Sequence, residues 1–393
     1  MSRKHFSWLL VATLVLGVLV VLLPGRTSKE SEFEVRTLIP GLAEQVNNVD
    51  QVEVVKAGNA TVATLQRQDD RWVVAEFGAY PADWPQLRGL LANLAQAEVI
   101  ELKTANPEYF SRLGVSDVAN DDSQATLLRL SGAGIDSAVL VGNAADGREG
   151  QYVRLEGGDQ ALLVNQALDI PATAKDWLQR DIVDIADAEV VEVEVLHADG
   201  SQVRALKTSA DDDDFVLQDI PQGREVLSAW SVNSMANALA KLQLDAVARV
   251  DTVDFSNATK FRLLTADGLE VLAEIAEVAE AVPAADGDDP AAEAATKTWL
   301  KLAANAYETG DAETAETAEA TGDTDSTGVM DGESPVAEEP ADEDGAESTQ
   351  DAGQRAAEIN RRVQGWAFEI PSYKADAMTK EMDELLKALP VPE

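Results

Sequence analysis

The sequence predicts an α+β protein in which an N-terminal transmembrane helix precedes two tandem repeats of an antiparallel-sheet-plus-helix unit. Three observations lead to this prediction: an uncharged apolar stretch near the N-terminus, alternating segments that end in a helical stripe, and the return of the same order later in the chain. The predicted parts are a cytoplasmic N-terminus at 1–5, a transmembrane helix at 6–23, a connector at 24–44, a first unit at 45–187 and a second unit at 188–393, with a disordered acidic insertion at about 303–360.

The apolar stretch at 6–23 is the predicted membrane helix. It has no charged residue, and at about 1.5 Å per residue it nearly matches a hydrocarbon layer of about 30 Å. A cleaved signal peptide is the alternative, but its apolar region is usually about 7–15 residues long and ends in small residues, whereas this stretch ends in Leu22 and Leu23. The short N-terminus favours the cytoplasmic side. We therefore expect residues 6–23 to hold the chain in the bacterial inner membrane, with its bulk in the periplasm.

The first unit begins with a hairpin pattern. Two alternating segments, 49–55 and 62–66, flank a turn at Gly58, and a third strand is expected at 71–74. Asp83 is placed to cap a helix that carries leucines at helical spacing. Four further strands and a closing helix are expected at 126–130, 138–142, 152–155, 161–164 and 173–185.

The same order of segments returns in the second unit. A strand at 191–196, a turn at 197–200 and a strand from Val203 precede a helix expected from Ser231, the position equivalent to Asp83. The further strands and the closing helix are expected at 260–264, 271–275, 299–302, 366–370 and 375–389. Chance similarity between short amphipathic strands is the alternative explanation.

An acidic stretch interrupts the second unit. No Lys or Arg occurs from Leu302 to Gln354, where Ala, Glu, Asp, Thr and Gly dominate. Such a composition buries too little apolar surface to fold alone, so a disordered insertion is expected at about 303–360. Binding of calcium or of a partner is the alternative, although the carboxylates lack the spacing of a calcium loop.

The composition argues against several classes of function. A formal net charge of −40 repels phosphate backbones, so no nucleic-acid partner is expected. The chain has no Cys and only two His, His5 and His197, which leaves little for metal sites or nucleophilic triads. We therefore predict no enzyme, no catalytic, cofactor-binding or metal-binding residue and no cofactor, and we leave a small-molecule ligand open.

Three polar features allow both a functional and a structural interpretation. Asp211 to Asp214 offer clustered oxygens to a cation, but adjacent side chains splay apart in a turn, and solvation is the simpler interpretation. His197 lies in a turn, where an exposed imidazole is commoner than a catalytic base. The segment from Gly142 to Gly147 lacks the Lys and Ser or Thr of a phosphate loop and favours a strand connection.

Five tryptophans fall in or beside predicted strands and helices. That position favours packing in the core, and lining of a ligand surface is the alternative. They are Trp72, Trp177, Trp230, Trp299 and Trp366. Arg154 and Arg180 stand out against the acidic background, where internal ion pairs are favoured over contact with a partner.

Several phrases together resemble a bacterial family. They are Asp70 to Val74, Pro81 to Asp83, Asn106 to Val115, Tyr152 to Arg154 and Asp176 to Arg180. In this order the chain is similar to domain-of-unknown-function family 4340 over roughly residues 50–275 and again, weakly, from Trp366, while the acidic insertion departs from the pattern. The resemblance implies an N-terminal membrane segment and a repeated α+β extracytoplasmic region. Members are often associated with ABC-type transport systems of the gliding-motility type, which implies an auxiliary subunit.

The segment from Asn106 to Val115 has a structural interpretation of its own. Asn106 before Pro107 disfavours helix, so a short helical turn is expected to begin there and to end at Gly114 with a positive φ. Such a knob would lock the connection between the helix and the following strands.

Three hypotheses of function follow. The first is a non-enzymatic, membrane-anchored accessory or scaffold subunit of an envelope ABC-type transport complex, with protein partners in that complex. The second is a periplasmic ligand-binding module that recognises an envelope glycan or peptide in a groove between the two units. The third is a carboxylate-dependent hydrolase, which an Asp- and Glu-rich chain never excludes.

Overall fold

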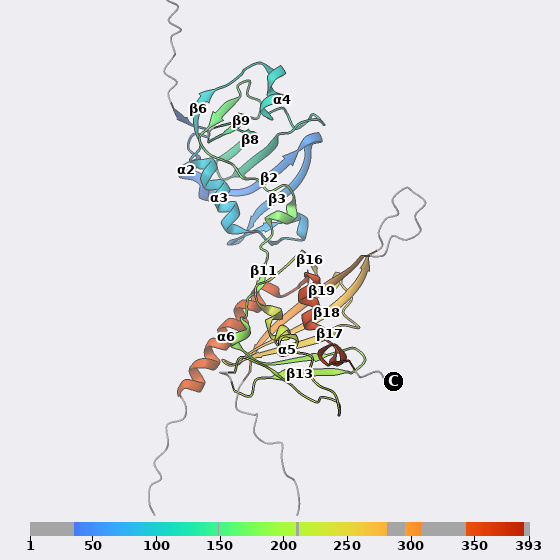
Figure 1. Ribbon diagram of the computed structural model, residues 1–393. Helices are drawn as coiled ribbons and strands as arrows, with labels where there is room; N and C mark the ends of the chain where they lie inside the picture. Colours follow the sequence, from blue (N-terminus) through green and yellow to red (C-terminus); the bar gives the residue numbers. More distant parts are fainter. Residues whose placement is uncertain (1–34, 148, 210–211, 281–294, 308–342, 389–393) are drawn as a thin grey trace, which may run out of the picture. The chain divides into compact units, whose positions relative to one another are not determined.

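The computed structural model describes residues 35–147, 149–209, 212–280, 295–307 and 343–388 (Figure 1). These residues form two compact units, and the division in the sequence lies between Leu178 and Gln179. Each unit is built around one large antiparallel sheet and therefore has a core of its own.

The predicted fold class is wrong. The described residues are mostly antiparallel strands, arranged in three sheets, and most of their helices are only a few residues long. No helix in the described ranges combines the length and the apolarity that a membrane crossing needs. An α+β fold with an N-terminal transmembrane helix is therefore not supported, and the stretch at 6–23 lies outside the described residues.

The first unit contains a ten-stranded sheet with the order β1-β6-β10-β9-β8-β7-β2-β3-β4-β5. Alternation of apolar and polar residues gives its strands a buried face, as in β2, where Val52 and Val54 are buried on either side of Glu53. The strands are β1 (Arg36–Thr37), β2 (Val49–Lys56), β3 (Ala60–Gln68), β4 (Arg71–Val74), β5 (Tyr80–Pro81), β6 (Glu98–Leu102), β7 (Thr126–Gly132), β8 (Ile135–Ala144), β9 (Gln151–Leu155) and β10 (Leu162–Val164).

One long helix, α3 (Trp84–Ala95), contributes its apolar stripe to the core of the first unit. The carboxylate of Asp83 accepts a hydrogen bond from Gln86 N at 3.1 Å and caps the helix, as predicted. Leu87, Leu90 and Leu94 are buried. Two short helices complete the unit, α2 (Leu42–Gln45) and α4 (Phe110–Leu113).

The connector knob (residues 106–115) forms as predicted. The Asn106 side chain accepts a hydrogen bond from Glu108 N at 3.1 Å, and the chain leaves α4 through Gly114 at a φ of 69°. The predicted ion pairs are also confirmed: Arg154 contacts Asp117 at 2.5 Å and Arg180 contacts Asp245 at 3.7 Å. The guanidinium of Arg154 therefore has an internal, structural role.

The second unit contains an eight-stranded sheet with the order β14-β13-β12-β17-β18-β19-β20-β16. Its strands are β12 (Val190–Leu196), β13 (Gln202–Leu206), β14 (Val216–Leu217), β16 (Ala246–Arg249), β17 (Thr259–Thr265), β18 (Leu269–Glu280), β19 (Ala295–Ala306) and β20 (Trp366–Glu369). Two further strands, β11 (Asp181–Val183) and β15 (Leu242–Gln243), form the third sheet. The helices are α5 (Ala229–Ala236), α6 (Glu343–Val363), α7 (Ser372–Met378) and α8 (Met382–Leu385).

The two large sheets share one strand order over eight strands. The order β4-β3-β2-β7-β8-β9-β10-β6 in the first unit corresponds, strand for strand along the chain, to β14-β13-β12-β17-β18-β19-β20-β16 in the second. An isolated antiparallel bridge also recurs before the main helix, Ala82 with Leu178 in one unit and Val226 with Leu386 in the other. This agreement argues against chance similarity between the two halves of the chain.

Two predicted helices are not continuous. The segment at 173–185 forms a 3-10 turn, η5 (Ala174–Trp177), and then strand β11, because Asp181 and Val183 pair with β15 and the β-branched Ile182 and Val183 favour a strand. The segment at 375–389 is divided between α7 and α8, since Glu381 and Glu384 form a new capping box.

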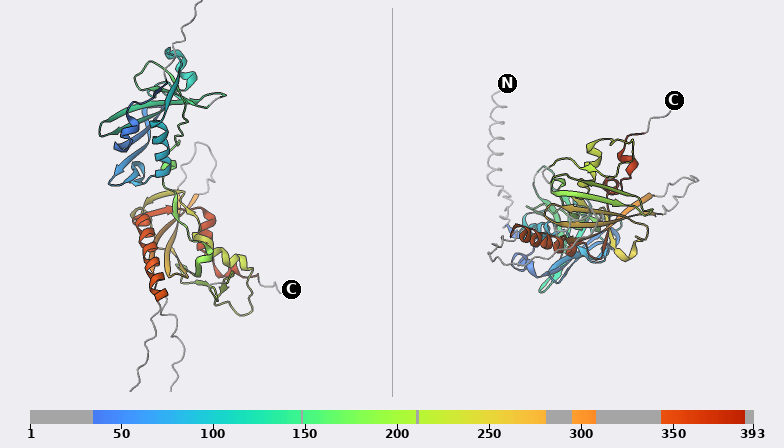
Figure 2. Two further views of the ribbon diagram at one scale, coloured as in Figure 1. Left: turned by 90° about the vertical axis from the view of Figure 1, so that its left-hand side faces the viewer. Right: turned by 90° about the horizontal axis from the view of Figure 1, so that it is seen from below.

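The predicted disordered insertion is corrected at both ends. Within 303–360, strand β19 continues to Ala306 and helix α6 begins at Glu343, while residues 308–342 lie outside the described ranges. Helix α6 lies alongside the sheet of the second unit (Figure 2). Ala352, Ala356 and Val363 recur at helical spacing and are buried there.

Polar contacts hold α6 at the edge of β19. Strand β20 pairs with β19 only at Trp299 and Leu300, and farther along β19 the Asn360 amide exchanges two hydrogen bonds with the backbone of Ala304, at 2.8 and 2.7 Å. Asn360 thus takes the place of a neighbouring strand, which protects an otherwise open edge. Arg355 contacts Asp267 and, at 2.8 Å, Glu189.

We expect acid to loosen α6. Burial alone raises the pKa of Asp267, but hydrogen bonds from Thr265 and Arg355 outweigh it, and the net pKa is lowered. The carboxylate therefore stabilises the fold above the unfolded pKa, near 4, and this contribution is lost as the pH falls through the lower folded pKa. Asp267→Asn should cost about 1 kcal/mol at pH 7 in urea unfolding and much less at pH 3. An equal cost at both values would contradict this.

A candidate binding hollow in the second unit

The polar features singled out in the sequence form hydrogen bonds within the protein. Within the described ranges, no group of three or more His, Asp and Glu side chains could hold a metal ion. Asp214 accepts a hydrogen bond from the Asn233 amide at 2.7 Å, and Asp212 accepts one from Ser209 N at 2.9 Å, while Asp211 lies outside the described residues. These contacts tie the turn to α5 and do not bring the carboxylates together.

His197 joins two parts of the second unit. Its Nε2 lies 3.2 Å from the carbonyl oxygen of Lys380, and its Nδ1 lies 3.5 Å from Thr259 Oγ1. The half-buried imidazole therefore connects the turn before β13 to the segment between α7 and α8.

The tryptophans divide into buried and exposed residues. Trp177 and Trp366 are buried as expected, and Trp72 and Trp299 are half-buried. Trp230 departs from the expectation, because 79% of its surface is exposed. The alternative interpretation, an aromatic side chain on a ligand surface, therefore fits Trp230 alone of these five.

Trp230 lies at a cavity of about 560 Å³ in the second unit, called here the aromatic hollow. Its apolar lining consists of Leu227, Trp230, Tyr373 and Ala377, from α5, α7 and the residues before α5. Tyr373 is 67% exposed and Leu227 53% exposed. Large apolar side chains that are exposed to solvent within a concave site are typical of binding surfaces.

Local sequence explains why these side chains face solvent. Ser228 caps α5 by accepting a hydrogen bond from Ser231 N at 3.1 Å, which places Trp230 in the first turn. The buried face of α5 carries Val232 and Met235, and Trp230 precedes Val232 by two residues, or about 200° around the helix. The indole is therefore held on the outer side of α5.

Most polar groups of the aromatic hollow are already bonded within the protein. The side-chain oxygen Oδ1 of Asn233 accepts a hydrogen bond from Phe215 N at 3.0 Å, and the hydroxyls of Ser231 and Ser234 donate to backbone carbonyls. The carboxylates of Asp187 and Asp376 are exposed and form no ion pair with a described residue. The charged groups of the described rim that lack an ion pair are therefore acidic.

Lys374 supports the floor of the hollow. Its side chain is buried, and Nζ donates hydrogen bonds to the carbonyls of Asn237 at 2.9 Å and Ala240 at 2.6 Å. These carbonyls end the helical segment that α5 begins, so Lys374 fixes α7 against it. Burial lowers the pKa of Lys374, and the nearby Asp184 opposes this only in part.

The lowered pKa predicts a stability that rises with pH. Between the folded pKa of Lys374 and the unfolded value near 10.4, the unfolded chain binds the proton more tightly, so raising the pH through this window stabilises the fold. A neutral amine keeps both donated hydrogen bonds. We expect Lys374→Met to lower the urea midpoint more at pH 10 than at pH 7. The exposed control Lys260→Met should shift both midpoints alike, and equal behaviour of the two variants would contradict this.

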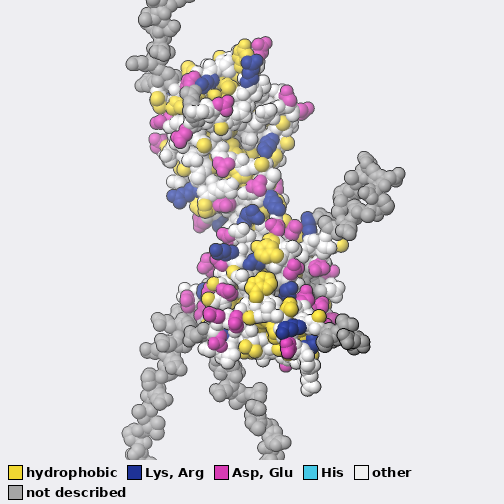
Figure 3. Space-filling model, in the orientation of Figure 1, with side chains coloured by type: hydrophobic (Ala, Val, Ile, Leu, Met, Phe, Trp, Pro, Cys, Tyr) yellow, Lys and Arg dark blue, Asp and Glu magenta, His cyan; other side chains and the backbone are white. Residues whose placement is uncertain are grey.

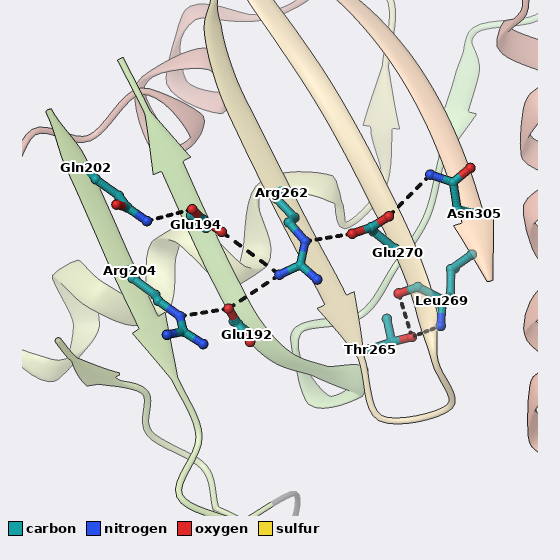
Figure 4. A network of polar contacts seen from close by, with 9 residues as sticks. All are labelled: Glu192, Glu194, Gln202, Arg204, Arg262, Thr265, Leu269, Glu270 and Asn305. Atoms are coloured by element: carbon teal, nitrogen blue, oxygen red, sulfur yellow. Dashed lines mark hydrogen bonds and ion pairs between the residues drawn. The ribbon is translucent and has the colours of Figure 1, made fainter. Parts of the chain in front are cut away.

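An ion-pair network stiffens the polar face of the sheet (Figure 4). Arg262 contacts Glu270 at 2.6 Å and Glu192 at 3.4 Å, and Arg204 contacts Glu192 at 2.8 Å. The carboxylates alternate with guanidinium groups across neighbouring strands, so this face has no unpaired cluster of one sign. Its arrangement is structural.

Apolar side chains lie close together on part of the surface of the second unit (Figure 3). Figure 3 shows apolar side chains gathered on the visible face of the second unit, with acidic side chains around them. A smaller hollow in the first unit, lined by Leu102, Tyr109 and Arg112, is less available, because Arg112 lies over the Tyr109 ring at 5.0 Å. The aromatic hollow is therefore the stronger candidate site.

Comparison with known proteins identifies the family. No curated protein and no solved structure matches the chain significantly. Residues 72–262 match the model of the family described as "Domain of unknown function (DUF4340)". This match begins in β4, includes α3 of the first unit and α5 of the second, and ends in β17, so it spans the junction of the two repeats. Residues 72–262 of the chain therefore belong to the DUF4340 family.

Proposed function

We propose that this chain is a non-enzymatic accessory or scaffold subunit of an envelope ABC-type transport complex, and that it binds a protein partner through the aromatic hollow. The transport setting is inferred from the resemblance described above, whose members often accompany such systems. The binding role is inferred from the geometry of the second unit.

The exposure of Trp230 and Tyr373 at one cavity carries the proposal. Trp230 on the capped helix α5, Tyr373 on α7 and Leu227 just before α5 are exposed to water, although the same unit has an apolar core. Exposed aromatic residues in a concave site are the anchors that protein interfaces use most.

The position of the hollow supports a specialised role for the second unit. In the first repeat, the chain passes from β10 to the closing bridge through the single turn η5. In the second repeat, α7 and α8 occupy the corresponding stretch between β20 and its bridge, and they form one wall of the hollow. The hollow is thus built where the two copies of the repeat differ.

Photo-crosslinking tests the proposal. Replacement of Tyr373 in the full chain by p-benzoylphenylalanine should yield, in cells, a crosslink to a transporter permease or ATPase that mass spectrometry identifies. Trp230→Ala should remove most of this crosslink. Trp84→Ala, at an indole that is 47% exposed in the first unit, is the matched control and should leave it unchanged. A crosslink insensitive to Trp230, or none at all, would overturn the proposal.

A further inference from the structure

The charges around the aromatic hollow indicate the chemistry of its partner. We infer that the hollow binds a cationic peptide segment, one with Lys or Arg beside leucine-like or aromatic side chains. This inference rests on the proposed function and adds the partner's charge and class to it.

The balance of charge at the rim is negative. Asp187, Asp376 and Glu384 line the hollow, against Lys374 and Lys380. Lys380 lies 3.7 Å from Glu384, and Lys374 is engaged by the carbonyls of Asn237 and Ala240. The two carboxylates without an ion pair, Asp187 and Asp376, therefore set the sign of the potential that an incoming segment meets.

The apolar lining favours a partner whose apolar side chains cover it and exclude water. Leu227, Trp230 and Tyr373 together present rings and methyl groups that gain free energy only when water leaves them. A segment that carries both apolar and cationic side chains satisfies the lining and the rim at once, and guanidinium or ammonium groups also stack favourably on exposed rings.

A glycan fits less well. Recognition of sugar hydroxyls needs many free hydrogen-bonding groups, because each buried hydroxyl left unpaired costs free energy. In the hollow, the side chains of Asn233, Ser231 and Ser234 already form hydrogen bonds within the protein. Among the described residues of the hollow, the Asn237 amide, the Tyr373 hydroxyl, the Trp230 indole N–H and two carboxylates remain, and the acidic pair favours a cation over a neutral carbohydrate.

Binding of matched peptides to the full chain tests the inference. The probe is a fluorescent twelve-residue peptide of alternating Leu and Lys, and its partner has Glu in place of every Lys. We expect the Lys peptide to bind about tenfold or more tightly than the Glu peptide, with Trp230→Ala removing most of this affinity. Binding is followed by fluorescence anisotropy at low and moderate salt.

The effect of the chain's net charge on peptide binding must be distinguished from the effect of the rim carboxylates. A chain of net charge −40 attracts any cation, so the decisive comparison uses two double variants with the same charge change. Asp187→Asn with Asp376→Asn should weaken binding of the Lys peptide about fivefold or more. Asp251→Asn with Glu277→Gln, two exposed carboxylates of the second unit that do not line the hollow, should have little effect.

The possible outcomes separate the inference from the proposed function. Equal weakening by both double variants, equal binding of the Lys and Glu peptides, or preferential binding of chitotetraose would overturn the cationic-peptide inference. The crosslink from position 373 would still support partner binding in those cases. If that crosslink were absent but the Lys peptide still bound in a way that depends on Asp187 and Asp376, the proposed transport partner would be wrong. The inferred preference for a cationic peptide would then still hold.

Discussion

Arg154→Met is expected to lower the free energy of unfolding of the first unit by about 3 kcal/mol. The side chain is 3% exposed, and Nε donates to Val115 O and Nη1 to Gly158 O, each at 2.9 Å. Methionine would fill much of the space but would leave both carbonyls without a donor, which costs about 1–3 kcal/mol at buried Val115 and less at half-buried Gly158. The ring of Phe110, 4.7 Å from the guanidinium, would also lose its cation.

The control for Arg154 is an arginine of the same sheet that pairs at the surface. Arg129 lies 3.0 Å from Glu156 and 3.8 Å from Glu53, and its side chain is 41% exposed. Arg129→Met should cost less than about 1 kcal/mol, because exposed ion pairs contribute little. Urea unfolding measures both variants, and hydrogen exchange should show faster opening of the connector knob in Arg154→Met alone. Equal costs would show that Arg154 acts only as a surface charge.

Local signals in the sequence predicted much of the fold. Asp83 caps α3 because a cap depends on neighbouring residues alone, and the alternation in β2 and β4 is equally local. The segment at 173–185 was misassigned because a short apolar run fits a helix and a strand alike, and this run becomes a strand through the pairing of Asp181 and Val183 with distant β15. Pairing over such distances leaves no local trace.

The candidate site was harder to predict than the fold. Trp230 was expected in the core because it lies beside a predicted helix, which was placed from Ser231 although its cap is Ser228. With the helix started at Ala229, the spacing to Val232 and Met235 would have put the indole on the outer face. Helix α6 was hidden for a different reason: its buried face is largely alanine, which composition alone does not distinguish from an acidic linker.

Gly142→Ala is expected to destabilise the first unit by about 3 kcal/mol through a close approach of backbone. A Cβ at this position of β8 would lie 2.3 Å from Leu113 O and 2.7 Å from Val115 Cγ1, both in the connector knob. A carbonyl cannot yield as a flexible side chain does, so the knob would have to move off the sheet. Arg154 would then lose its bond to Val115, and the two substitutions should not be additive.

A second glycine provides the matched control. Gly89 lies inside α3, and a Cβ there would meet nothing within 4 Å. Gly89→Ala should therefore stabilise the unit by about 0.5–1 kcal/mol, since alanine restricts the unfolded chain and favours helix. Urea unfolding should give changes of opposite sign in the free energy of unfolding for the two variants. Together with faster hydrogen exchange at residues 106–115 in Gly142→Ala only, this would establish that the connector knob packs directly on β8. A neutral Gly142→Ala variant would mean that the connector knob adapts to the added methyl group, and the expected non-additivity with Arg154→Met would then fail as well.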